Sequence, residues 1–371
     1  EALADTGVDR VELQRRTLRS LRAAQVPGQA AVAGMVAVVS LLASDLLGSD
    51  RLAGMGSASF TVGAAFTAIP LAAFMRRRGR RIGLTRALLV GALGATIAAT
   101  GGQLRWFPLF VVGMVAFGAG QAATLQQRYV AADLAEPAKQ GASIAAIVWV
   151  GTLGAALGPL LTPLEKAAAE RVGLDELVGP FVFAAAFFLV AAMVMWVRLR
   201  PDPLEVVGGI DPHAERTRML RVVRSSAGVI LASPGARLGI AAMAASQAAM
   251  VGVMTMTPPH MKDHGHADLS AFVIALHIVG MYGLAPLVGR FVDRSGAIRA
   301  IQVGAVILGA GTIATVLAGY VPVLLFVGLF FLGLGWNFGL IGGTTILTAS
   351  VPEGSRVEVQ GTGDLTLSLC G

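Results

Sequence analysis

The sequence is poor in charges, in aromatic side chains and in cysteine, and each shortage excludes a class of protein. Only 14% of the 371 residues are charged and 6% are aromatic, whereas 55% are hydrophobic. This composition does not fit a soluble globular protein. Cys370 is the single cysteine, so neither a disulfide framework nor a Cys-x-x-Cys metal site can form. The sequence also has no phosphate-binding glycine loop and no nucleophile constellation, so we expect neither ATP-driven work nor an enzyme.

Long apolar stretches, by contrast, recur along the whole chain. Each is close to the ~20 residues that cross a bilayer as one helix. The predicted spans are roughly 30–48, 52–75, 83–104, 106–127, 140–162, 178–198, 235–257, 269–290, 297–319 and 322–349. An eleventh begins near Gln360 and is cut off at Gly371, so we expect a trimmed chain. The pattern predicts an all-α, multi-pass membrane protein.

A polar segment divides these spans into two sets. Residues 199–234 hold the longest polar run between spans, which predicts a linker. Residues 1–29 form an Arg-rich tail, expected either as a surface helix on anionic lipid or as a charged tail that only sets topology. We therefore expect a first six-helix bundle at 30–198 and an incomplete second bundle at 235–371. Repeated halves around a central pathway are a transporter design.

The net charge of +7 is distributed unevenly between the two ends of the spans. Five Lys and Arg lie in the loops at one end, which leaves 24 of the 29 at the other end. Loops rich in Lys and Arg stay in the cytoplasm. The bias predicts an inner-membrane protein with a cytoplasmic N-terminus, and it explains the basic charge without a nucleic-acid partner. We expect a monomer surrounded by the lipid bilayer.

Two short motifs carry a family resemblance. One follows the eighth predicted span and the other lies in the fifth. Their residues are Gly289, Arg290, Asp293, Arg294, Gly296 and Arg299 in the first motif, and Gly154, Gly158 and Pro159 in the second. The first resembles the signature loop of the major facilitator superfamily, and the second resembles that superfamily's antiporter-type motif. The resemblance implies two six-helix bundles related by pseudo-two-fold symmetry (the MFS fold), here truncated in the eleventh helix.

The resemblance also implies that these motif residues form a latch, which holds one conformation of a rocking protein. Asp293 can meet a helix N-terminus or a basic residue. The alternative is a basic turn that only fixes topology. Two positions depart from the superfamily pattern, since Arg76 replaces the usual acid of the first-half loop and Met114 replaces an arginine of the antiporter pattern. Because of Arg76, we expect the latch of the first-half loop, the front latch, to be missing or different. Met114 weakens the hypothesis that the protein exports drugs in exchange for protons.

Paired soft donors occupy two neighbouring predicted spans. Met250 and Met254 are four residues apart on the seventh span, and His277 and Met281 are four apart on the eighth. Each pair shares one helical face, and thioether with imidazole suits Cu(I). An ionisable ring deep in a span usually faces a cavity or a partner. The alternative for the methionines is flexible core packing.

The loop between these two spans, 258–266, adds His260, His264 and His266, three of the five histidines. They could capture a metal ion outside, or the loop could be solvated and bind nothing. With the two pairs, the pattern resembles the CcoA-like copper importers of the superfamily. That resemblance implies copper as the transported substrate rather than as a resident cofactor, and it assigns uptake to the four paired residues.

Three further polar residues lie within predicted spans. Gln247 stands one turn before Met250, and Asn337 follows Trp336 in the tenth span. We expect them to line a cavity or to form hydrogen bonds between helices. Asp364 is the one acid that is embedded in a span, where it could carry a proton or pair with Arg356.

We therefore predict a permease that takes up Cu(I) by alternating access and passes the ion between weak sites. One alternative is a proton-coupled exporter of small organic molecules, favoured by the motif in the fifth span. Another is a membrane-embedded metal sensor or assembly factor. The predicted substrate is accordingly a metal ion or a small molecule, and the sequence leaves the energy source open.

Overall fold

The computed structural model describes residues 10–212, 219–263, 270–319 and 321–371, and these are almost entirely helical, without a strand. Ten of the described helical segments are long and apolar enough to cross a membrane. They match the predicted spans in number and order, which confirms the all-α fold class. The helices are α1 Arg10–Leu47, α2 Gly54–Arg78, α3 Arg80–Gln103, α4 Phe107–Asp133, α5 Gln140–Arg171, α6 Gly179–Arg198, α7 Pro203–Val206, α8 Met219–Ala232, α9 Pro234–Asp263, α10 Ser270–Ile278, α11 Ala285–Ser295, α12 Ala297–Leu317, α13 Pro322–Ala349 and α14 Glu353–Cys370.

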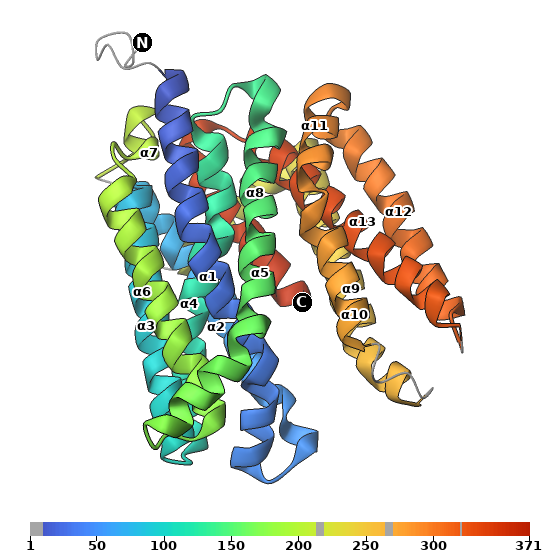
Figure 1. The fold of residues 1–371 in the computed structure, drawn as a ribbon. Coiled ribbons are helices and arrows are strands. Elements are labelled where there is room, and N and C mark those ends of the chain that lie inside the picture. Colours follow the sequence, from blue (N-terminus) through green and yellow to red (C-terminus); the bar gives the residue numbers. More distant parts are fainter. Residues whose placement is uncertain (1–9, 213–218, 264–269, 320) are drawn as a thin grey trace.

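The chain forms two bundles, and each is packed around a buried hydrophobic cluster. α1 to α6 surround a cluster in which Phe110 packs edge-on against Phe181, and Phe117 packs against Phe188. α9 to α14 build the second bundle around Trp336 and Leu340. Figure 1 shows the ribbons of the two bundles close together where α7 and the start of α1 lie, and diverging toward the opposite end. We call the end where the bundles lie close together the basic end, because arginines gather there where α2 meets α3 and where α11 meets α12.

The Arg-rich segment at the start of the chain differs from the expected surface tail. α1 is one helix from Arg10 to Leu47, and Leu21 within its first half is buried. Gln14 donates a 2.8 Å hydrogen bond to the carbonyl of Ala131 at the end of α4. The apolar side chains of this segment alternate with its arginines at helical spacing, so one face packs on the bundle while the arginines remain outside.

The polar linker is also partly built into the fold. The carboxylate of Asp202, just before α7, accepts hydrogen bonds from the backbone N–H groups of Arg80 at 3.1 Å and Arg81 at 2.8 Å. This carboxylate therefore satisfies free N–H groups at the start of α3. Further along the linker, α8 packs against α9 and α14. The segment thus connects the bundles and also covers their basic end.

The eighth predicted span is interrupted. α10 and α11 are joined by a π-helical turn, Val279–Gly283. Pro286 lies in the first turn of α11, and because proline lacks an N–H it cannot continue the regular hydrogen-bond ladder. π-helical turns occur frequently at functional sites. This one carries Tyr282, whose ring packs against Trp336.

Candidate functional site

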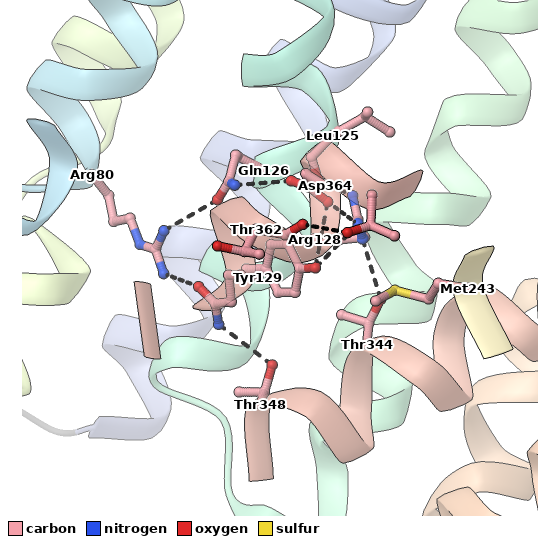
Figure 2. A network of polar contacts seen from close by, with 12 residues as sticks. Arg80, Leu125, Gln126, Arg128, Tyr129, Met243, Thr344, Thr348, Thr362 and Asp364 are labelled. Carbon is pink, nitrogen blue, oxygen red and sulfur yellow. Dashed lines mark hydrogen bonds and ion pairs between the residues drawn. The ribbon is translucent and has the colours of Figure 1, made fainter. Parts of the chain in front are cut away.

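A buried polar network joins the two bundles near the basic end (Figure 2). Arg128 of α4 forms an ion pair with Asp364 of α14, and their side chains are only 3% and 1% exposed. The same carboxylate accepts a 2.8 Å hydrogen bond from the Gln126 amide and a 3.4 Å bond from the Tyr129 hydroxyl. Asp364 is therefore fully supplied with donors, as a buried carboxylate has to be.

A second buried arginine extends this network into α3. Arg80 binds the carboxylate of Asp133 with two nitrogens, at 2.9 and 3.2 Å. It also donates to the Gln360 amide oxygen of α14 at 2.8 Å, and Gln360 in turn donates to Thr348 of α13 at 3.4 Å. Thr344 of α13 accepts a 3.2 Å hydrogen bond from Arg128. The inter-bundle network comprises Arg80, Gln126, Arg128, Tyr129, Asp133, Thr344, Thr348, Gln360 and Asp364.

The sequence places these side chains through simple helical spacing. Gln360 and Asp364 are four residues apart on α14, and so are Thr344 and Thr348 on α13, so each pair faces the first bundle from one helical face. α14 approaches α2 closely because Gly361 has no side chain. A Cβ at that position would lie 2.5 Å from the Cβ of Ala72.

The charges of the network balance only while the bundles touch. Arg80 and Asp133 both belong to the first bundle, whereas the pair of Arg128 and Asp364 spans the two. Separating the bundles here would leave two buried charges without partners, and breaking such a pair costs ~3–5 kcal/mol. The network therefore stabilises a state in which the basic end is closed.

The signature loop makes a second contact across the bundles. The Asp293 carboxylate accepts hydrogen bonds from the backbone N–H groups of Gly141 at 2.7 Å and Ala142 at 2.9 Å, in the first turn of α5. Two free N–H groups and the helix dipole favour an anion at this position. Gly289 lies against Ala145 and could not carry a larger side chain. Gly296 has φ 87°, a conformation that favours glycine.

The arginines of that loop do not share this role. Arg290, Arg294 and Arg299 are exposed. Arg299 borders a surface cavity of about 690 Å³, which is also lined by Asp293, Gly296 and Gln302. The motif of the fifth span acts elsewhere, because Gly154 and Gly158 belong to the face of α5 that packs on α1 inside the first bundle, whereas Pro159 is exposed. A Cβ at Gly158 would lie 2.5 Å from the backbone nitrogen of Gly34.

The expected departure at Arg76 has a structural counterpart. The Arg76 guanidinium lies 2.9 Å from the Glu358 carboxylate of α14 and 3.4 Å from Asp211 of the linker. The first-half loop therefore does hold the second bundle, but through an ion pair rather than through an acid at a helix N-terminus. The front latch is thus different rather than missing.

A cluster of aromatic and amide side chains lies deeper at the junction. The Trp336 ring N–H donates a 2.8 Å hydrogen bond to the amide oxygen of Gln247. The ring of Tyr282 meets Trp336 edge-on, with centroids 5.6 Å apart and planes at 73°. Gly151 of α5 faces this cluster, because a Cβ there would lie 4.0 Å from Tyr282 and 3.6 Å from the amide nitrogen of Gln25. The cluster therefore borders both bundles.

The proposed copper ligands have mixed surroundings. His277 is 2% exposed, and its Nδ1 lies 2.8 Å from the carbonyl oxygen of Leu329, while its Nε2 has no hydrogen-bond partner in the described part of the chain. Met250 borders the buried cluster that contains Met281. Met254 borders a second cluster, built around Leu329 and Leu332.

The other candidate ligands add no described site. His260 falls in the last turns of α9, and His264 and His266 lie outside the described residues. Within the described ranges, no group of three or more His, Cys, Asp or Glu side chains could hold a metal ion. Asn337 is fully buried, and neither atom of its amide has a hydrogen-bond partner among the described residues.

A model of the Major Facilitator Superfamily matches residues 28–371. The chain belongs to the Major Facilitator Superfamily. This membership confirms a multi-pass membrane transporter. The chain resembles the uncharacterized MFS-type transporter YddS of Bacillus subtilis (strain 168), with 38% identity over 97% of this chain and 83% of the relative. It also resembles the riboflavin transporter RfnT of Brucella anthropi, with 28% identity over 95% of this chain and 85% of the relative.

Solved structures of superfamily transporters share the fold. The human organic anion transporter MFSD10 (TETRAN) superposes with a TM-score of 0.75 at 17% identity, over 96% of this chain and 91% of that one. The proton:xylose symporter XylE gives a TM-score of 0.70 at 14% identity, over 98% and 87%. None of the relatives named here bears out the resemblance to CcoA-like copper importers, which stays a prediction.

Sequence reasoning missed the partners of Asp364. It offered Arg356, but Arg356 lies 3.9 Å from Glu353, whereas Asp364 binds Arg128. Arg128 follows directly after the fourth predicted span, where we counted it among the charges that set topology. The signal that pointed to it was the polar run Gln126, Gln127, Arg128, which a loop charge does not explain.

Proposed function

We propose that this transporter carries a small organic solute across the membrane by alternating access. The observation that carries the proposal is the ion pair of Arg128 and Asp364, which joins the bundles where both side chains are almost fully buried. Opening the basic end requires that pair to separate, so the two charges must be neutralised or find other partners. The inter-bundle network is then the part of the protein that a transport cycle has to break and re-form.

An organic cargo is supported by chemistry and by likeness. The junction of the bundles presents amides and aromatic rings, namely Gln25, Gln247, Tyr282 and Trp336. Such groups fix the orientation of an organic solute through a few polar contacts on apolar walls. RfnT, which is 28% identical over 95% of this chain, is a riboflavin transporter by name. We use riboflavin as the first probe for that reason.

The charge bias supports a direction. If the arginine-rich basic end faces the cytoplasm, the state described here is closed inside and ready to receive solute from outside. We therefore propose uptake rather than export. Right-side-out and inverted membrane vesicles distinguish the two directions, because only one of them accumulates solute from the medium.

The decisive experiment measures riboflavin uptake into proteoliposomes. We expect Asp364→Asn and Arg128→Gln each to lower the initial rate more than tenfold, since each leaves a buried charge unpaired. Glu353→Gln is the matched control on the same helix, because the Glu353 side chain is 80% exposed. If Asp364→Asn transported as fast as the unchanged protein, the proposed role of the network would be wrong.

Copper uptake is the second candidate, and a specific observation favours it. The His277 ring is buried, and its Nε2 is left without a hydrogen bond among the described groups, as an imidazole awaiting a metal ion would be. Met281 lies one turn further along and is 7% exposed. Uptake of radioactive copper that is lost in His277→Ala, by a protein that does not transport riboflavin, would favour this candidate over the organic solute.

A further inference from the structure

We propose that Tyr282, Trp336 and Gln247 of the second bundle, together with Gln25 of the first, bind an uncharged, planar heteroaromatic ring whose edge carries hydrogen-bonding groups. The inference rests on the proposed function, because it names the class of organic solute.

The depth of the cluster suits a solute site. Gln247, Tyr282 and Trp336 each lie about 13 residues from the basic end of their helical segment, which at ~1.5 Å per residue is ~20 Å from that end. A bilayer with its headgroups is ~40 Å thick, so the cluster lies near the midplane. Transporters with repeated halves bind their solutes at that depth.

The cluster supplies a surface for a flat ring. Tyr282 and Trp336 pack edge-on with planes at 73°, so the two rings form a corner rather than a closed stack. The Trp336 orientation is fixed by its bond to Gln247. Rings held in this way lose little freedom when a third ring stacks on them or meets their edge. The π-helical turn that carries Tyr282 is a further sign of a functional position.

The facing wall supplies an unpaired polar group. Gln25 is 6% exposed, and its amide oxygen has no hydrogen-bond partner in the described part of the chain. A buried amide that stays unpaired costs free energy, which a ligand with an N–H or O–H group would recover. Gln25 and Tyr282 border the same position, Gly151, from opposite bundles. A ring bound there would touch both halves of the transporter.

Local charges favour an uncharged ring. The buried charges of the inter-bundle network, Arg128 and Asp364, are paired with each other. The side chains of the cluster itself carry amides, a phenol and an indole. A charged solute would therefore find no counter-charge in this cluster, whereas a ring with amide or imide edges matches its donors and acceptors.

Gly151 allows a test with matched variants. A Cβ at this position meets Gln25 and Tyr282 only at ordinary contact distances, so Gly151→Ala fits the structure. Gly151→Leu would project a branched side chain between Gln25 and Tyr282, where the ring is proposed to bind. Alanine and leucine both favour a helix. A difference in ligand binding between the two variants therefore reports the site rather than the helix propensity of the new residue.

The experiment measures binding to purified protein in lipid nanodiscs with three probes. Lumichrome is a flavin ring without the sugar alcohol, ribitol is the sugar alcohol without the ring, and riboflavin has both. We expect lumichrome and riboflavin to bind and ribitol not to bind. We also expect Gly151→Leu and Tyr282→Leu to weaken lumichrome binding at least tenfold, and Gly151→Ala to weaken it less than threefold.

Two outcomes would overturn the proposal. One is an absence of lumichrome and riboflavin binding, and the other is unchanged binding in both leucine variants. Transport of ribitol or of another non-aromatic solute that still depends on Asp364 would then leave the proposed function standing and remove only the ring site. A single elution peak for each variant in size-exclusion chromatography separates a lost site from a lost fold.

Discussion

Arg76 and Asp293 occupy equivalent positions in the two bundles. They carry opposite charges, and each holds the basic end closed. Each stands three residues before a glycine with φ 87°, Gly79 and Gly296. Asp293 accepts from backbone N–H groups at the start of α5, whereas Arg76 lies 2.9 Å from Glu358 of α14. The pseudo-symmetric turns thus perform the same task with different chemistry, and only the contact of Arg76 is formed by two side chains.

An ion pair between side chains can be reversed by substitution. Arg76→Glu places a third acid beside Glu358 and Asp211 and should lower the transport rate severalfold by weakening the closed state. Adding Glu358→Arg restores opposite charges and should recover most of that loss. Because the two side chains are 26% and 17% exposed, we expect a coupling free energy of only ~1 kcal/mol in a double-mutant cycle.

Asp211 provides the control for this cycle, because it lies 3.4 Å from Arg76 in the linker rather than in the second bundle. Asp211→Asn should change transport less than Glu358→Gln does. If the reversed pair of Arg76→Glu and Glu358→Arg were no better than Arg76→Glu alone, the contact would not hold the bundles together.

The contact of Asp293 cannot be reversed in this way, because its partners are backbone groups. Asp293→Ala should weaken the closed basic end by up to ~2 kcal/mol, the larger value measured for a charge at a helix terminus. Val292→Cys places a reporter beside it, since Val292 is 3% exposed. In a Cys370→Ser background, thiol labelling of this reporter should rise when Asp293 is replaced.

The matched control for that labelling is Arg294→Ala. Arg294 belongs to the same signature loop but is exposed. The sequence pattern assigned both residues to the latch. In the structure, Asp293 accepts hydrogen bonds from backbone N–H groups of the first bundle. Labelling that rose equally in both variants would show that the whole loop, rather than Asp293, controls access.

The fold could be predicted largely from hydropathy. Each span is a local property of about twenty residues, and the ten spans recur in the structure in their predicted order. The interruption of the eighth span was less visible. Pro286 indicates a break, but the π-helical turn before it depends on packing against α13.

The site could be predicted only where its geometry is local. The place of Asp293 follows from its position in the last turn of α11, and its meeting with a helix N-terminus was one of two outcomes that we expected. The pairing of Arg128 with Asp364 joins residues 236 positions apart. It depends on which faces of α4 and α14 meet, and one sequence does not contain that information.

That pairing predicts a large effect on stability. Arg128→Leu and Asp364→Leu should each lower the melting temperature strongly, because each leaves a buried charge unpaired at a cost of ~3–5 kcal/mol. The double variant removes both charges and should melt above either single variant. Thermal unfolding in detergent measures all four proteins. If the double variant melted at the same temperature as the less stable of the two single variants, a direct interaction between Arg128 and Asp364 would be contradicted.

The glycines of α5 give a last prediction, which separates packing from latching. Gly154 and Gly158 resemble an antiporter motif, yet a Cβ at Gly158 would lie 2.5 Å from the backbone of Gly34, inside the first bundle. Gly158→Val should therefore destabilise that bundle by about 2 kcal/mol through overpacking. Gly252→Val is the matched control in α9, because nothing lies within 4 Å of a Cβ there.

Thermal unfolding should show Gly158→Val melting several degrees below Gly252→Val, since ~2 kcal/mol is a large part of a folded protein's net stability. Transport per folded molecule should remain, because Gly158 touches α1 rather than the second bundle. A variant that melts normally but is locked in one orientation would instead assign this glycine to the conformational change, as the antiporter motif suggests. The two measurements together therefore decide whether the motif in this chain serves the helix crossing or the transport cycle.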